Sequence, residues 1–86
     1  MEELDRLKRA LGKVKAFGEF EASQRPYWLE LRQAVQYFLR RSRNDEHAGL
    51  TAAYRGVHDM PELQPREGER WHLLRDEVCA ALRADG

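Results

Sequence analysis

The chain has 86 residues, of which 42% are hydrophobic, and its 15 basic and 15 acidic side chains give a formal net charge of zero. A balanced charge argues against indiscriminate binding to DNA or to acidic membranes, and this hydrophobic content argues against a chain that stays disordered throughout. Ala, Leu, Glu and Arg dominate while Ile is absent, a composition that favours helices over strands.

The cellular setting is suggested by what the sequence lacks. Its single cysteine, Cys79, cannot form a disulfide within the chain, which is typical of a reducing compartment. The first residues are charged, unlike a secretory signal, and no apolar run reaches the roughly 18–20 residues of a membrane span. We therefore expect a cytoplasmic protein with one helical domain over residues 1–86. The preference for Arg over Lys suggests a GC-rich bacterial or phage genome.

The first predicted helix covers about residues 2–22. Apolar residues recur there at spacings of three and four, which places them on one stripe: Leu4, Leu7, Leu11, Val14 and Phe17. Acidic residues lead the segment, where the positive end of the helix dipole favours them.

The second predicted helix covers about residues 24–43. Ser23 is a suitable N-cap, and Pro26 is tolerated in a first turn because its missing N–H would have no partner there. Nine of the thirteen residues from 27 to 39 are apolar, more than a one-sided stripe requires. We therefore expect this helix at the centre of the fold, contacted by the other three.

Two further helices are predicted at about residues 45–58 and 66–84. Ser42, Asn44 and Asp45 are candidate caps for the third, which Gly49 and Gly56 should make the weakest. The fourth has an apolar stripe of Trp71, Leu74, Val78 and Leu82. Together the four segments predict an all-α fold, a compact bundle of four helices, antiparallel where the loops are short.

Catalytic and metal-binding patterns are weak. Arg41 lies six residues before His47, a spacing found in some small helical nucleases, but Arg66 stands at the same distance before His72, as chance allows in a chain with twelve arginines. The histidines and Cys79 do not have the i,i+4 spacing of a helical zinc site. We predict no enzyme activity, no catalytic residue, no metal and no cofactor.

Binding to another protein is the function that the sequence favours. Several apolar residues point away from the predicted stripes or fall in the loop after the third helix: Leu29, Tyr37, Met60, Leu63 and Leu73. Four short helices do not easily bury this much extra apolar surface, so part of it is expected to form a docking patch. The predicted protein is a small adaptor or regulator whose partner is another protein or a second copy of the chain, as in a homodimer.

Nucleic-acid binding is the alternative. Arg32, Gln36, Arg40 and Arg43 are spaced by four, four and three along the second predicted helix, and Arg and Gln bind phosphates and base edges. A looser row of Arg6, Arg9 and Lys13 lies on the first helix. Residues 1–43 carry a net charge of +4 and residues 44–86 a net charge of −4, so a local basic face is compatible with the neutral total. The same asymmetry suits two halves that attract each other within one fold, or head-to-tail association.

Overall fold

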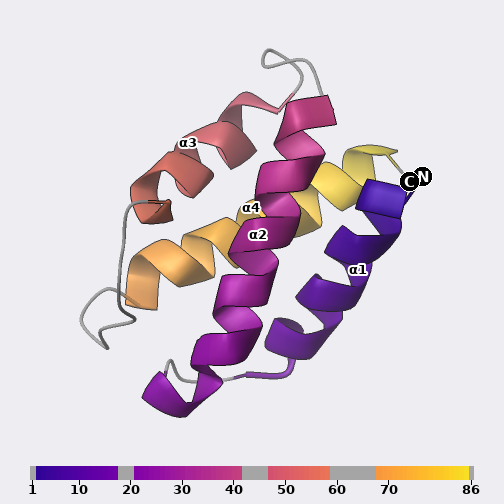
Figure 1. Cartoon of the computed structure of the whole chain (residues 1–86). Coiled ribbons are helices and arrows are strands. Elements are labelled where there is room, and N and C mark those ends of the chain that lie inside the picture. Colours follow the sequence, from indigo (N-terminus) through magenta and orange to yellow (C-terminus); the bar gives the residue numbers. More distant parts are fainter. Residues whose placement is uncertain (1, 18–20, 42–46, 59–67, 86) are drawn as a thin grey trace.

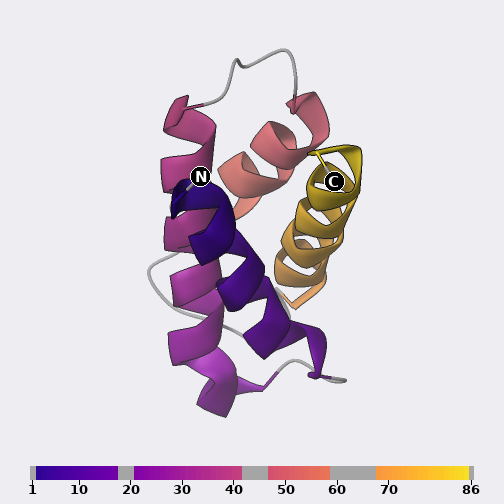
Figure 2. The same ribbon diagram turned by 90° about the vertical axis from the view of Figure 1, so that its right-hand side faces the viewer.

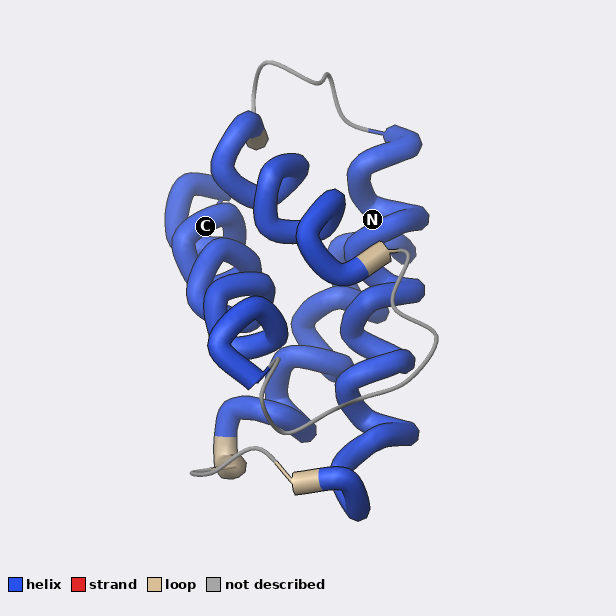
Figure 3. The backbone as a smooth tube through the Cα atoms, turned by 90° about the vertical axis from the view of Figure 1, so that its left-hand side faces the viewer, coloured by secondary structure: helices blue, strands red, loops and turns tan. Residues whose placement is uncertain are grey.

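The computed structural model describes residues 2–17, 21–41, 47–58 and 68–85 of the chain. These ranges contain helices α1 (Glu2–Lys15), α2 (Arg25–Arg41), α3 (Ala48–Val57) and α4 (Gly68–Asp85), with a short 3-10 helix, η1 (Ala22–Gln24), before α2. No strand occurs within them (Figure 3). The predicted all-α fold of four helices is confirmed. None of the described helices has the length and apolar character needed to cross a membrane.

The helices form two packed pairs. α1 and α2 run side by side in opposite directions, and α3 and α4 form the second pair behind and beside them (Figures 1 and 2). α2 packs against each of the other three helices, as expected for a central second helix, and α4 does the same. The outer flank of α2 nevertheless remains exposed at Glu30, Gln33 and Arg40. α2 is therefore not fully enclosed, and its uncovered side lies next to α1.

All four helices contribute to one core. Its buried residues are Leu7, Ala10, Leu11 and Val14 from α1, Trp28, Leu31, Ala34, Val35 and Phe38 from α2, Leu50, Ala53 and Val57 from α3, and Trp71, Leu74, Val78 and Ala81 from α4. The stripes predicted for the first and fourth helices supply six of these residues, and the apolar stretch within residues 27–39 supplies the five from α2. Each helix also supplies one alanine, whose small side chain permits close approach of the helix axes. Cys79 is half-buried at the edge of this core, as a small packing residue.

The first helix is shorter than the predicted segment 2–22. α1 ends at Lys15, and the backbone N–H of Phe17 donates to the carbonyl of Val14 at 3.1 Å, which closes a turn in place of another helical step. Phe17 still packs inward, with its ring centroid 5.6 Å from that of Tyr27 and 6.2 Å from that of Trp28. The apolar spacing had correctly indicated that Phe17 faces the core, but an inward-facing position does not require a helical backbone.

The entry into α2 is organised by Gln24 and not by Ser23, the predicted cap. Gln24 is buried, and its Oε1 accepts hydrogen bonds from Trp28 Nε1 at 2.9 Å and from the backbone N–H of Glu21 at 3.2 Å. Ser23 Oγ instead lies 3.4 Å from Glu21 Oε2. A side-chain amide thus satisfies the polar atom of a fully buried tryptophan, which would otherwise be costly to desolvate.

The third helix begins later than predicted, at Ala48. Its N-cap residue, His47, makes no side-chain capping bond, while the predicted caps Ser42, Asn44 and Asp45 lie outside the described residues. The carboxylate of Glu77 in α4 lies against Gly49 in the first turn of α3. It therefore places a negative charge near the positive end of this helix dipole, where such a charge is stabilising.

Candidate functional site: an arginine and tyrosine groove between α1 and α2

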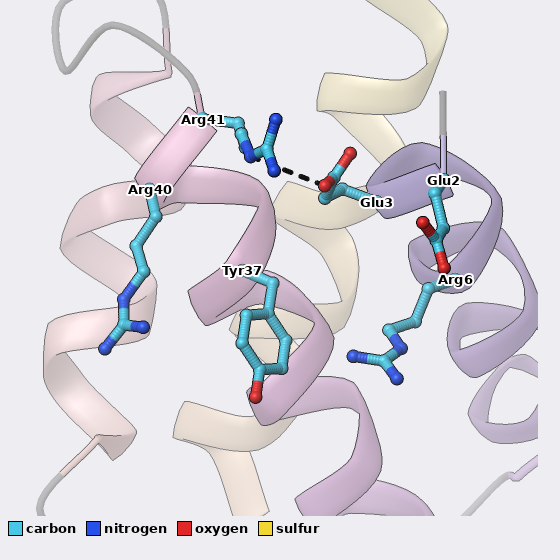
Figure 4. A pocket seen from close by; sticks show the side chains of 6 residues that line it. All are labelled: Glu2, Glu3, Arg6, Tyr37, Arg40 and Arg41. Atoms are coloured by element: carbon cyan, nitrogen blue, oxygen red, sulfur yellow. Dashed lines mark ion pairs between the residues drawn. The ribbon is translucent and has the colours of Figure 1, made fainter.

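A hollow of about 360 Å³ lies where the start of α1 meets the end of α2 (Figure 4). Its size falls within the range of roughly 300–1,000 Å³ that is common for ligand sites. Six side chains line it, three of them arginines: Glu2, Glu3, Arg6, Tyr37, Arg40 and Arg41. The antiparallel pairing of the two helices brings residues near opposite ends of the first half of the chain into one site.

Tyr37 lies at the middle of this hollow, flanked by two cations. The guanidinium carbon of Arg6 is 5.1 Å from the centroid of the Tyr37 ring, and that of Arg40 is 6.0 Å from it. Figure 4 shows the Tyr37 ring between the guanidinium groups of Arg40 and Arg6, with the hydroxyl at the end of the ring. Cation–π attraction to the ring favours this arrangement, because it offsets part of the repulsion between two like charges. Two guanidinium groups and a phenol hydroxyl thus line the same hollow.

The third arginine is occupied by an ion pair. Arg41 Nε lies 3.4 Å from Glu3 Oε1, with the arginine side chain 73% exposed and the glutamate side chain 19% exposed. An exposed pair of this kind contributes at most about 1 kcal/mol to stability. It does, however, place a carboxylate of the chain itself beside the other two arginines.

A second hollow of about 330 Å³ continues the first along α1. It shares Glu2 and Arg6 with the first hollow, and it adds Arg9, Lys13 and Glu30. We call the two together the α1–α2 groove, which is lined by five cationic and three acidic side chains and so carries a net positive charge.

The cations of the groove differ in their pairing. Lys13 Nζ lies 3.1 Å from Glu30 Oε2, and Arg41 is paired with Glu3. Within the described residues, Arg6, Arg9 and Arg40 make no ion pair. These three arginines therefore form the part of the groove that is available to an anionic group.

The groove is suited to binding carboxylates or phosphates. Guanidinium groups present planar pairs of donors that match both anions, and a phenol adds a donor or an acceptor. No family model matches the chain, and no curated protein or solved structure is significantly similar to it. The groove is therefore interpreted from its own chemistry.

The residues predicted to bind a protein partner are not in one patch. Leu29, which lies off the main stripe of α2, is half-buried and packs against the edge of the core. Leu73 is 51% exposed on α4, and Tyr37 lies in the groove. Met60 and Leu63 lie outside the described residues. Among described residues, Tyr27 and Leu73 are the large apolar side chains classed as exposed.

The row predicted to bind nucleic acid does not form a single face either. Arg32 turns inward, where it donates to the carbonyl of Val57 at 3.2 Å and lies over the ring of Trp71, 5.6 Å from its centroid. Gln36 is half-buried, Arg40 is exposed in the groove, and Arg43 lies outside the described residues. The inward turn of Arg32 has a physical reason, since it satisfies a carbonyl at the end of α3.

Sequence reasoning placed Tyr37 and Arg40 in separate hypotheses and left Arg41 out of both. The structure brings these residues together with Arg6 from the looser row on α1. That row was the signal from which the groove could have been found, because an antiparallel hairpin places the start of α1 beside the end of α2.

The histidines and Cys79 do not gather into a metal site within the described residues. No group of three or more His, Cys, Asp or Glu suited to a metal ion occurs within residues 2–17, 21–41, 47–58 and 68–85. The two residues of the nuclease-like spacing, Arg41 and His47, make separate contacts. The ring of His47 packs on Phe38 with a centroid distance of 5.0 Å, and Arg41 pairs with Glu3 on α1. The ring of His72 packs on Trp28 with a centroid distance of 5.6 Å.

Proposed function

We propose that the protein is a small non-enzymatic helical adaptor or regulator that binds another protein through the α1–α2 groove. The observation that carries the proposal is the position of Tyr37 between the guanidinium groups of Arg6 and Arg40. Tyr and Arg are among the residues most enriched at the energetic centres of protein interfaces. The backbone of both is fixed here in helices, so binding does not have to order the backbone.

Three carboxylates favour a protein partner over nucleic acid. Glu2, Glu3 and Glu30 line the same groove as the arginines, and they would repel the closely spaced phosphates of a polyanion. A protein segment can place single carboxylates beside Arg6, Arg9 and Arg40 while keeping polar or basic groups beside the acidic positions. Such mixed complementarity is the usual source of specificity at protein interfaces.

Nucleic-acid binding is the second candidate, supported by the five cationic side chains that follow one another along the groove. It predicts an affinity that falls steeply with salt, with a log–log slope of about −0.9 for each phosphate contacted on duplex DNA. A protein segment has no condensed counterions, so its affinity should fall less steeply.

A selection from a random peptide library tests the proposal. Peptides enriched on the wild-type protein should lose binding to Tyr37→Ala and to Arg40→Glu, and they should keep it with Arg55→Glu, which makes the same charge change on the exposed side of α3. Peptides that bind all four proteins equally would place the contact elsewhere. Binding to duplex DNA or single-stranded RNA with the steep slope, and to no peptide, would replace this proposal with the second candidate.

A second copy of the chain is the simplest partner to test. Sedimentation at micromolar and millimolar concentrations should give twice the chain mass of 10.1 kDa if the groove pairs with itself or with another face of the molecule. Tyr37→Ala should then restore the single mass, whereas Arg55→Glu should not.

A further inference from the structure

We propose that the element bound in the α1–α2 groove is an acidic amphipathic helix of about three turns, lying along α1 and α2. This inference rests on the proposed function and adds the chemistry and conformation of the partner. It follows from the length of the groove, from the backbone groups around it and from the spacing of the cations on its α1 side.

The groove has the length and the position expected of a binding site for a helix. Its lining on α1 extends from Glu2 to Lys13, which at 1.5 Å per residue corresponds to about 17 Å, or three helical turns. It lies between two antiparallel helices on the side that α3 and α4 leave uncovered (Figures 1 and 2). A further helix packed into the groove between two others is how helical bundles are extended.

The described fold offers little to an extended peptide. An extended segment has unpaired backbone N–H and C=O groups that usually bind at a sheet edge, and the described residues contain no strand. The lining of the groove consists of helical residues whose backbone groups are largely committed to the helices themselves. A helix satisfies its own backbone groups, so burial of one face in the groove leaves few of them without partners.

The spacing of the cations on α1 determines where acidic residues should stand in the partner helix. Arg6, Arg9 and Lys13 are three and four residues apart on one face of α1. A helix lying alongside faces them with side chains at the same spacing, so carboxylates at positions i, i+3 and i+7 would each meet one cation. Lys13 already pairs with Glu30, and the two positions nearest to Arg6 and Arg9 should therefore matter most.

One carboxylate of the partner has a defined place. Beside the Tyr37 hydroxyl, it would accept hydrogen bonds from the phenol and from the guanidinium group of Arg6 or Arg40, which lie on either side of the ring (Figure 4). Charge-assisted bonds from a guanidinium group and from the phenol make this position the anchor of the interface. Glu2 and Glu3 at the rim would exclude a second acidic side chain directly beside it.

Three synthetic peptides of identical composition test the inference by calorimetric titration into the full chain. The first is helical with glutamates at i, i+3 and i+7, the second is helical with the glutamates spread around its circumference, and the third is the first with proline moved to its centre, which prevents a helix. We expect the first to bind at least about tenfold more tightly than the others, equivalent to the loss of one charge-assisted bond. Equal affinity of the first and second, or of the first and third, would overturn the inference.

Exchanging the charge of one groove arginine with that of one peptide glutamate tests how the peptide helix is aligned with α1. It also separates a loss of binding from a loss of folding. Arg6→Glu should weaken binding of the first peptide by about tenfold or more, and replacing one of the three glutamates by lysine should restore it. Arg83→Glu on α4 is the control, because it makes the same charge change on an exposed helix outside the groove. Failure of every lysine peptide to restore binding to a folded Arg6→Glu protein would overturn the register. If peptides from the random library require Tyr37 while none of the designed helices binds, the helix inference is wrong and the proposed function stands.

Discussion

Gly49 occupies a helical position where an alanine would displace the end of the Glu77 side chain. An added Cβ would lie 2.5 Å from Glu77 Oε2, whereas at Gly12 and Gly56 it would have nothing within 4 Å. Replacing glycine by alanine within a helix ordinarily stabilises it by about 0.5–1 kcal/mol. The three glycines therefore provide a direct measure of what the Glu77 carboxylate contributes beside the first turn of α3.

We predict that Gly12→Ala raises the free energy of unfolding by about 0.5–1 kcal/mol and that Gly49→Ala gains less or destabilises the protein. The clash displaces Glu77 from the positive end of the helix dipole, which offsets the gain in propensity. Urea titrations followed by tryptophan fluorescence measure both. In a Glu77→Ala background, Gly49→Ala should recover the gain seen at Gly12; an equal gain at both positions in the wild-type background would contradict this account.

Gln24 provides a second test at the level of single residues. Gln24→Ala removes the acceptor for Trp28 Nε1, a group on a side chain with no exposed surface, and it should cost about 1–3 kcal/mol of stability. Gln33→Ala, at an exposed position of α2, is the matched control and should change stability by less than about 0.5 kcal/mol. Equal unfolding midpoints for the two variants would show that the hydrogen bond to Trp28 is not needed.

Among the elements, α3 has the weakest local support. It has ten residues, it contains two glycines and its N-cap makes no side-chain bond. Short isolated helices are marginal, so the stability of α3 depends on the packing of Leu50, Ala53 and Val57 on its neighbours. As predicted from composition, we therefore expect the third helix to be the weakest of the four.

Hydrogen exchange tests this ranking. Backbone amides in the middle of α3 should exchange faster than those in the middle of α2 and α4, because local opening of α3 exposes less buried surface. Measurement by NMR at a pH where the native state is stable gives the protection of each amide. Protection in α3 equal to that in α2 would indicate that the bundle opens only as a whole.

The element boundaries show what periodicity reveals and what it does not. Spacings of three and four identified all four helices and most of their buried residues, because burial of one face imposes that pattern. The end of α1 was missed because Phe17 keeps its inward position after the helix has stopped. The role of Gln24 was missed because its partner, Trp28, is identified only once the turn before α2 is known.

At the scale of the whole molecule, the opposite charges of the two halves do not act through ion pairs in the described structure. The described ion pairs join groups within one half each. The two halves are linked instead by the shared core and by arginines that donate to backbone carbonyls: Arg32 to Val57, and Arg75 to Phe17 at 3.5 Å. The basic excess of the first half is left on its outer surface, and part of it forms the α1–α2 groove.

This arrangement explains why the candidate site was only partly predictable. Tyr37 and Arg40 stood out on α2 as an outward-pointing aromatic and part of a basic row. Their meeting with Arg6 depends on which helices pair and on their direction, information that no single segment contains. Leu29 lies off the main stripe of α2, and the sequence did not show that it would nevertheless pack against the edge of the core.

The central claim is that the Tyr37 hollow binds a carboxylate of a partner protein. The most direct test is calorimetric titration of the matched acidic helix into the wild-type chain, into Arg6→Glu with Arg40→Glu, and into Arg55→Glu with Arg83→Glu. The account predicts saturable binding to the wild type and to the second pair, and at least about a hundredfold loss with the first pair, as two charge-assisted contacts are removed. Equal loss in both double variants would mean that the peptide responds only to overall charge, which would contradict the groove as the binding site.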